Sequence, residues 1–241
     1  MNELQGQTVV VIGGSSGVGF ETARQARAAG AELILAARTR ERLEIAAQQL
    51  QARQTAAFDA ADLAQLEQFF KDLPGPVDHI MVTAGGPAYM PLSSMNLDDA
   101  RRHLDQRLSV VLGTPLFSRG RLRPGGSLLF IGGTGARRPG VGFAITTTLT
   151  AAIPALAANL ALELAPTRVN VIAPGFVDTP LSATLLGDQI DARRQQLRET
   201  LPIGRVVGPA DVAALAAQVM SNGAITGATL DIDGGQQLLA R

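Results

Sequence analysis

The chain has 241 residues, 46% of them hydrophobic, and its 21 basic side chains balance its 21 acidic side chains, so the formal net charge is zero. This length fits one large α/β domain or two small ones, and the balanced charge excludes a global positive field that would attract nucleic acid or an anionic membrane. The absence of cysteine excludes disulfides, thiolate catalysis and cysteine-bound metal, and is compatible with a reducing compartment.

Strand-like and helix-like segments alternate along the whole chain, which predicts a parallel sheet covered by helices on both faces. No linker, repeat or low-complexity tract divides the chain, so we expect one domain over residues 1–241. The expected strands are Thr8–Ile12, Glu32–Ala36, Thr55–Phe58, His79–Val82, Ser127–Ile131, Arg168–Ile172 and Thr229–Ile232. The expected helices are Gly19–Ala29, Glu41–Ala52, Leu63–Asp72, Leu97–Phe117, Ile145–Ala165 and Ala210–Met220.

The first strand runs into a glycine-rich turn with the spacing Gly13-x-x-x-Gly17-x-Gly19. Glycine allows a tight turn and a close backbone approach to a ligand, and the helix that follows presents unpaired N–H groups to an anion. The segment therefore predicts a phosphate cradle, although an ordinary strand-to-helix turn can have the same features. The residues expected to contact a cofactor here are Gly13, Ser15, Ser16, Gly17, Val18 and Gly19.

The end of the second strand indicates which cofactor the cradle would bind. An acidic residue at this place would accept hydrogen bonds from the ribose hydroxyls of NAD, but the sequence has Ala37 followed by Arg38. A guanidinium pairs well with a 2′-phosphate, so the sequence favours NADP(H) over NAD(H). The alternative is that Arg38, Arg40 and Arg42 are solvated charges at the start of a helix.

Three later strand ends supply further parts of such a site. Asp59, beside Ala60, can accept a hydrogen bond from an adenine amino group, and the run 83–86 offers a backbone approach at Ala84 and Gly85. The run 168–179 ends in a turn expected to hold a nicotinamide carboxamide through Pro174, Gly175, Val177 and Thr179.

Together with the run 225–235, these motifs resemble the short-chain dehydrogenase/reductase family along essentially the whole chain. The resemblance implies an α/β, doubly wound Rossmann fold with a seven-stranded, mostly parallel sheet. It also implies a nicotinamide dinucleotide cofactor, a small carbonyl, quinone or alcohol substrate, and a homotetramer or homodimer.

The sequence departs from that family at the catalytic positions. The family uses a Tyr-x-x-x-Lys pair, a serine upstream of it and an asparagine in the preceding helix. Aligning the run 144–151 with this motif places Ile145 at the tyrosine and Leu149 at the lysine, Gly132 at the serine and Arg107 at the asparagine. The single tyrosine, Tyr89, and the single lysine, Lys71, lie far from the motif along the chain.

The residues that could replace the missing acid are Arg107, Tyr89 and Thr134, with Arg137 and Arg138 available for an anionic substrate. Each also has a structural interpretation, as a paired surface charge, as loop packing or as a helix-start residue. His79 and His103 are too few and too isolated to predict a metal site.

Three functions therefore remain open. The first is an atypical NADP(H)-dependent oxidoreductase, and the second is a catalytically impaired NADP(H)-binding sensor or regulatory subunit. The third is a structural subunit of a hetero-oligomer with an active relative. Residues 180–207, which carry apolar residues among charges, are either a substrate lid or a surface helix pair without a gating role.

The sequence also favours a cytoplasmic protein that has no membrane partner. Residues 1–5 lack the basic and apolar pattern of a secretory signal. The apolar run Ala151–Leu162 contains Pro154 and Asn159 and ends at Glu163, which argues against a membrane span.

Overall fold

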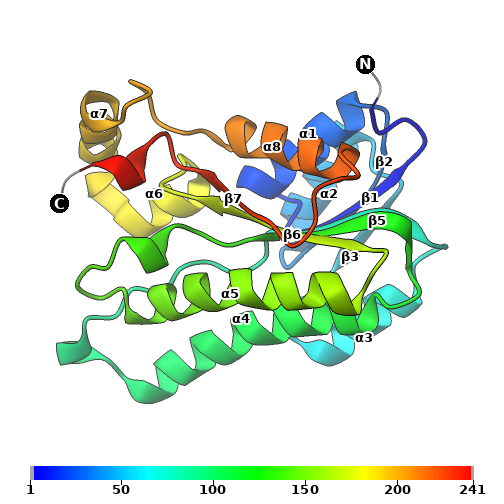
Figure 1. The fold of residues 1–241 in the computed structure, drawn as a ribbon, viewed down its shortest axis with the longest axis horizontal. Coiled ribbons are helices and arrows are strands. Elements are labelled where there is room, and N and C mark those ends of the chain that lie inside the picture. The colour runs from blue at the N-terminus through cyan, green and yellow to red at the C-terminus, as the bar shows by residue number, and fades with distance from the viewer. Residues whose placement is uncertain (1–2, 240–241) are drawn as a thin grey trace.

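A computed structural model describes residues 3–239, which form one seven-stranded parallel sheet with the strand order β3-β2-β1-β4-β5-β6-β7 (Figure 1). The chain runs from the central β1 outward to β3, returns to β4 beside β1, and continues outward to β7. The expected α/β, doubly wound Rossmann fold is therefore confirmed. The strands are β1 (Thr8–Ile12), β2 (Glu32–Ala37), β3 (Gln54–Ala57), β4 (Val77–Val82), β5 (Leu122–Ile131), β6 (Arg168–Pro174) and β7 (Thr229–Ile232).

Helices cover both faces of this sheet (Figure 1). Side chains alternate between the faces along each strand, so Val9 and Val11 of β1 join one core cluster while Val10 and Ile12 join the other. The first cluster contains residues of α1, α2 and α8, and the second contains residues of α3, α4 and α5. The helices are α1 (Gly17–Ala28), α2 (Arg40–Leu50), α3 (Leu63–Lys71), α4 (Leu97–Phe117), α5 (Ala144–Glu163), α6 (Pro180–Leu186), α7 (Ile190–Thr200) and α8 (Pro209–Ser221).

The expected elements are present with shifted ends. α1 begins at Gly17 rather than Gly19, directly after the extended Ser16, and Gly17 has a positive φ of 54°, which glycine adopts readily. β5 begins at Leu122, five residues before the expected start, because its first residues pair beside a register shift in β4. Residues 180–207 contain α6, α7 and a short connecting turn.

α5 is long and apolar enough to cross a membrane by length and composition alone. In this structure α5 packs against one face of the sheet, and its buried residues Ile153, Ala157 and Leu160 belong to the core cluster on that face. Pro154 lies inside the helix without ending it. The opposite side of α5 remains exposed and includes Ala151, Ala155 and Leu162.

Candidate functional site

The strand order reverses between β1 and β4, since the chain leaves β1 toward β2 on one side and returns to β4 on the other. In open α/β sheets, ligands bind outside the carboxyl ends of the strands at such a switch point. The glycine turn follows β1 and the run 83–86 follows β4, so both lie at this edge. The fold thus brings together two of the segments that the sequence predicts for a cofactor.

The glycine turn is closely packed against its neighbours. A Cβ atom on Gly13 would lie 2.3 Å from Thr83 Oγ1, and one on Gly19 would lie 2.2 Å from the Gly13 carbonyl oxygen. Thr83 Oγ1 in turn lies 3.2 Å from the carbonyl oxygens of Ile12 and Gly13. Gly13 and Gly19 therefore let the strand, the turn and the helix approach one another, a role that any βα unit of this kind needs.

The start of α1 is available to an anion. Ser16 is its N-cap residue but makes no side-chain cap hydrogen bond, and the first turn contains no acidic residue. The first N–H groups of a helix have no partner within the helix and carry partial positive charge. At Gly17 an added Cβ would meet only Thr179, at 3.6 Å. The site from Ser15 to Gly19 therefore suits a phosphate, and the residues present fit a dinucleotide.

Arg38 lies beside this anion site. The N–H groups of Gly13 and Gly14 both donate to the Ala36 carbonyl, at 2.7 and 3.1 Å, which joins the glycine turn to the end of β2. Arg38 follows two residues later, is exposed, and has no carboxylate partner among residues 3–239. Its guanidinium is therefore available to a second phosphate near the first.

Asp59 lies at the next strand end. The Phe58 N–H donates to the Ala37 carbonyl at 3.0 Å, which holds Asp59 next to the end of β2. Asp59 is exposed, and its Oδ1 accepts a hydrogen bond from the Ala61 N–H at 3.0 Å. Ala60 is buried. The second carboxylate oxygen of Asp59 is left to accept from a ligand.

Arg107 occupies the space between the carboxyl ends of β4 and β5. It is 9% exposed, and its two terminal nitrogens donate to the backbone carbonyls of Ala84 and Ile131. Burial lowers the pKa of Arg107 to about 10, and no carboxylate pairs with it among the described residues. Arg107 also fills the space next to Gly85, where a Cβ would lie 3.0 Å from Nη1. The Ala84 carbonyl is thus already engaged by this buried cation.

The loop after β6 is held by a residue that the sequence analysis did not identify. Gln236 Oε1 accepts a hydrogen bond from the Phe176 N–H at 2.9 Å and lies 2.4 Å from where a Cβ on Gly175 would be. The Gly175 N–H donates to the Ile232 carbonyl. Gly175 therefore has a structural reason to be glycine, and the only sequence signal for Gln236 is its position after the Asp233-Gly234-Gly235 turn.

The remaining predicted residues of that loop serve the loop itself. The Pro174 carbonyl accepts from the Thr134 N–H at 3.0 Å, and Val177 is buried and bridges to Val207. Thr179 Oγ1 accepts from the Ser182 N–H at 3.2 Å and caps α6. Thr179 nevertheless reaches Gly17, so the two ends of the predicted cofactor site are adjacent.

The positions aligned with the family's tyrosine and lysine require a correction. Ile145 and Leu149 are buried in an apolar cluster with Ala88 and Ala100, on the side of α5 that faces α4. A helix turns 100° per residue, and the face toward the end of β5 instead carries Thr146 and Thr150. A Cβ on Gly133 would lie 3.2 Å from Thr150 Cγ2, and one on Gly135 would lie 3.2 Å from Thr146 Cγ2.

The same one-residue displacement applies to the serine position. A Cβ on Gly132 would lie 2.9 Å from Val171 Cγ1, whereas a Cβ on Gly133 would meet only Thr150 and the Pro174 carbonyl. The hydroxyls of Thr146 and Thr150 bond to backbone groups, at Ala88 and at Thr146 itself. Thr146 and Thr150 are therefore the side chains at this edge, and neither is an acid near neutral pH.

Tyr89 and Thr134, the other suggested acids, lie apart from each other. Tyr89 is 48% exposed, and its ring lies 4.9 Å from that of Phe143. Burial raises the pKa of the Tyr89 hydroxyl, with the positive charge of Arg193 opposing that shift. Thr134 is buried beneath the β6 loop. Tyr89 thus packs on Phe143 in a half-exposed loop, and Thr134 is buried where its N–H bonds the end of β6.

α6 and α7 cover this end of the cleft. A Cβ on Gly86 would lie 3.4 Å from Leu181 Cδ2, so α6 reaches from the β6 loop to the loop after β4. Arg194 of α7 forms two hydrogen bonds to Asp178, at 2.9 and 2.8 Å. The helix pair therefore rests on both walls of the cleft.

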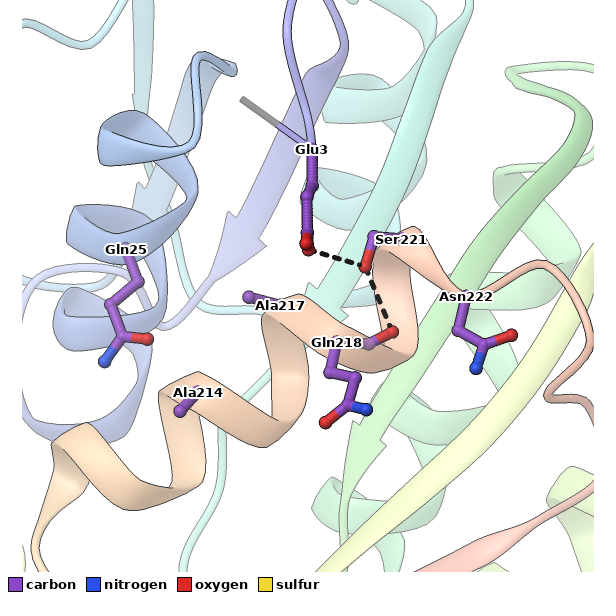
Figure 2. Close-up of a pocket in the computed structure, with 7 residues that line it drawn as sticks. All are labelled: Glu3, Gln25, Ala214, Ala217, Gln218, Ser221 and Asn222. Atoms are coloured by element: carbon purple, nitrogen blue, oxygen red, sulfur yellow. Dashed lines mark hydrogen bonds between the residues drawn. The ribbon is translucent and has the colours of Figure 1, made fainter. Parts of the chain in front are cut away.

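A cavity of about 710 Å³ lies elsewhere, between α1 and α8 (Figure 2). Figure 2 shows Gln25 and Gln218 on opposite walls and the Ser221 hydroxyl bonded to Glu3, at 3.3 Å. Glu3 precedes β1, and Ser221 ends the helix that leads to β7. This groove is therefore at the amino ends of the strands, on the edge opposite the glycine turn.

Comparison with known proteins identifies the same fold and motifs. Residues 12–237 match the family model described as Enoyl-(Acyl carrier protein) reductase. The chain is 32% identical to the short-chain dehydrogenase/reductase ucsE of Acremonium sp, over 97% of this chain and 96% of that protein.

Two solved structures extend the likeness to three dimensions. The MalC Reductase/Diels-Alderase of Malbranchea aurantiaca superposes with a TM-score of 0.90 at 26% identity, covering 99% of both chains. A small-chain dehydrogenase in complex with NADPH superposes with a TM-score of 0.83 at 27% identity, covering 98% of this chain and 100% of the other.

Proposed function

This chain belongs to the short-chain dehydrogenase/reductase family of oxidoreductases, and we propose that its cofactor is NADP(H) rather than NAD(H). The observation that carries the proposal is Arg38, an exposed guanidinium beside the glycine turn that has no carboxylate partner within residues 3–239, with Ala37 where a carboxylate would repel a phosphate. The NADPH complex of a structural neighbour supports it. The pyrophosphate would lie at the start of α1, and Asp59 would accept from the adenine.

We further propose that the enzyme is atypical and reduces activated acceptors, such as quinones or conjugated carbonyls. When bound, NADPH supplies a hydride to the acceptor carbon. Among the described residues, the segments that follow β4 and β5, 83–86 and 132–135, contain no carboxylic acid, histidine or lysine, and the hydroxyls of Thr146 and Thr150 are not acids near neutral pH. Arg107 would polarise that oxygen through those guanidinium N–H groups that do not donate to the Ala84 and Ile131 carbonyls. Water would then supply the proton and leave hydroxide.

The second candidate is a sensor or regulatory subunit that binds NADP(H) without turning it over. The apolar packing of Ile145 and Leu149, together with the backbone bonds of the nearby threonine hydroxyls, favours it. In this case α6 and α7 would act as the lid whose position reports the bound cofactor.

We propose that the protein works in the cytoplasm as a homodimer or homotetramer. The support for self-association is the exposed apolar side of α4 and α5, where Leu112, Leu116 and Leu162 are 50%, 58% and 80% exposed. An exposed apolar face of this kind is commonly a protein interface.

One paired measurement separates the two candidates. NADPH binding is titrated by nucleotide fluorescence, and NADPH consumption is then followed with quinones, conjugated carbonyls and simple ketones. An oxidoreductase turns over repeatedly with at least one acceptor class, and Arg107→Gln lowers that rate while binding persists. Tight binding without turnover across all classes supports the sensor, and absence of NADPH binding refutes both.

A further inference from the structure

A cavity of about 250 Å³ lies between α7, the turn after β5 and the segment 236–239. Two arginines from different elements line it, Arg138 and Arg193, together with the polar side chains of Gln196, Thr200 and Gln236. Leu197 of α7 is buried beneath them. This cavity is smaller than a typical site for a whole drug-sized ligand, so it suits one functional group of a larger molecule.

Neither arginine of this cavity has a carboxylate partner among residues 3–239. Arg138 donates to the Gln236 backbone carbonyl, and Arg193 Nη1 donates to Gln196 Oε1 at 2.7 Å. Burial lowers the pKa of Arg193, and the nearby Arg138 charge lowers it further. Two like charges that face one cavity without a counter-ion are destabilising unless an anion joins them.

The arginines adjacent to them in the sequence, in contrast, do have carboxylate partners. Arg137 pairs with Asp231 at 2.5 Å, and Arg194 pairs with Asp178 at 2.8 Å. Asp231 and Asp178 are therefore engaged by the adjacent arginines, and Asp233 accepts hydrogen bonds from the Gly235 and Gln237 N–H groups. None of these three carboxylates is paired with Arg138 or Arg193, which both line the cavity. Guanidinium groups bind carboxylate and phosphate in a bidentate manner.

The cavity adjoins the loop after β6, at the carboxyl end of the sheet. The Arg193 guanidinium carbon lies 5.8 Å from the centre of the Phe176 ring, and Phe176 belongs to the loop after β6. Gln236 lines the cavity and also accepts the Phe176 N–H. The positive charge of Arg193 also opposes the rise in the pKa of Tyr89, which lies on the loop after β4. Arg193 therefore contacts the loop after β6 and influences a titratable group on the loop after β4.

Resting on the proposed function, we propose that Arg138 and Arg193 bind an anionic group of the substrate, a carboxylate or a phosphate. The substrate class is then a small carbonyl or quinone compound that carries such a group, with the anion in this cavity and the reacting carbon toward Arg107. The same contact would draw α7 toward the turn after β5.

The test uses the whole protein without cofactor and three probes of similar size: benzoate, phenyl phosphate and neutral benzyl alcohol, titrated by calorimetry at fixed ionic strength. Benzoate or phenyl phosphate is expected to bind at least tenfold more tightly than benzyl alcohol, and the tighter of the two identifies the anion. Arg138→Gln and Arg193→Gln should each weaken anion binding roughly tenfold, the effect of one lost charge-assisted contact. Arg198→Gln, an exposed arginine on the same helix, should leave it unchanged.

Equal binding of the neutral probe, no anion binding, or an equal loss in Arg198→Gln would overturn the proposal. Each variant is checked by circular dichroism, and Arg193→Lys provides a second variant that keeps the charge and removes the bidentate fork. NADPH affinity is measured in the same samples. If the wild type does not bind NADPH, the proposed function is refuted. If it binds the anionic probes but not NADPH, the Arg138 and Arg193 anion site stands, so failure of the proposed function and failure of the anion site can be told apart.

Discussion

Arg194 and Asp178 form a two-point contact, with Nε donating to Oδ2 at 2.9 Å and Nη2 donating to Oδ1 at 2.8 Å. Asp178 belongs to the loop after β6, and Arg194 belongs to α7. This pair is the charged contact that attaches the predicted lid to the wall of the cleft.

We expect Arg194→Ala to loosen α6 and α7 without unfolding the sheet. The measurement is limited proteolysis with thermolysin, and cleavage within residues 181–200 should accelerate several-fold, because local opening exposes that backbone. Arg205→Ala, which removes a similar two-point pair with Asp211 at the start of α8, is the control and should leave cleavage in 181–200 unchanged. Equal protection of both variants would mean that the pair does not hold the lid.

NADPH should bind more tightly than NADH by roughly tenfold or more, since one charge-assisted contact to the 2′-phosphate contributes about 1.5–3 kcal/mol. Arg38→Asp should abolish or reverse that preference. Arg42→Asp makes the same charge change farther along α2 and should preserve most of it. Fluorescence titration of both nucleotides provides the affinities, and an unaltered preference in Arg38→Asp would remove Arg38 from this role.

Catalytic residues can be rebuilt in two registers, and the structure distinguishes them. Gly133→Ser, Thr146→Tyr and Thr150→Lys place the new groups on the face toward the end of β5. Combined, they should raise NADPH-dependent turnover of a small ketone, with positioned acid–base catalysis worth about 10²–10⁴-fold. Each single change should give little, because such residues act as a unit.

The set displaced by one residue, Gly132→Ser, Ile145→Tyr and Leu149→Lys, is the matched control. It buries a lysine in the apolar cluster of Ala88 and Ala100, which should lower the melting temperature without adding activity. A gain in turnover from this second set alone would mean that Ile145 and Leu149 do occupy the tyrosine and lysine positions of the family, as the sequence alignment predicts.

Acid should destabilise the fold through His79. Its Nε2 donates to Gln7 Oε1 at 2.6 Å, since a carbonyl oxygen only accepts, and its Nδ1 is hydrogen-bonded to the Ser127 hydroxyl at 2.8 Å. Burial, followed by the Arg168 charge, lowers the pKa of His79 to about 4. The unfolded chain binds this proton near pH 6.5. The free energy of unfolding is therefore unaffected by His79 above about pH 6.5 and falls as the pH decreases toward 4.

The loss associated with His79 should approach 3 kcal/mol, from about 1.36 kcal/mol per pKa unit. Chemical denaturation at pH 7, 5.5 and 4.5 measures it. His79→Gln retains groups that can bond Gln7 and Ser127 but cannot titrate, so its stability should vary less over that range. Equal slopes for both proteins would assign the acid sensitivity to other groups.

Self-association is expected through α4 and α5. Leu116→Asp introduces a charge on a residue that is 58% exposed in the single chain, and it should shift sedimentation at micromolar concentration toward the monomer. Ile45→Asp makes the same change on α2, where Ile45 is 57% exposed, and should not. A monomeric wild type would contradict the proposed interface.

The overall fold could be predicted because periodicity and strand-end glycines are local signals. The apolar run Val9–Ile12 and the turn at Gly13 specify the first βα unit, and later segments repeat the alternation. Element ends were less certain, as at β5, since its first residues pair through tertiary contacts that local sequence does not encode.

The sequence does not determine which residues of α5 face the carboxyl end of β5, where the family places its catalytic residues. Ile145 and Thr146 are adjacent in a run of small and β-branched residues, and only packing against Ala88 or the turn at Gly135 decides which one faces the cleft. The sequence also does not predict that Arg138 and Arg193 line one cavity, because the two residues are 55 positions apart in the chain. Arg107 was identified from the sequence, but its bonds to Ala84 and Ile131 depend on the fold.

The bond from Gln236 to the Phe176 N–H has a practical consequence for recombinant work. Leu239, the last residue that the structure describes, lines the Arg138 and Arg193 cavity, so a purification tag added on this side of Gln236 would adjoin that cavity. A poly-histidine tail there could disturb Gln236, and through it the loop at Gly175 and Phe176. Kinetic and binding assays are therefore best made with an amino-terminal tag, removed by protease, because Glu3 lies at the opposite edge of the sheet.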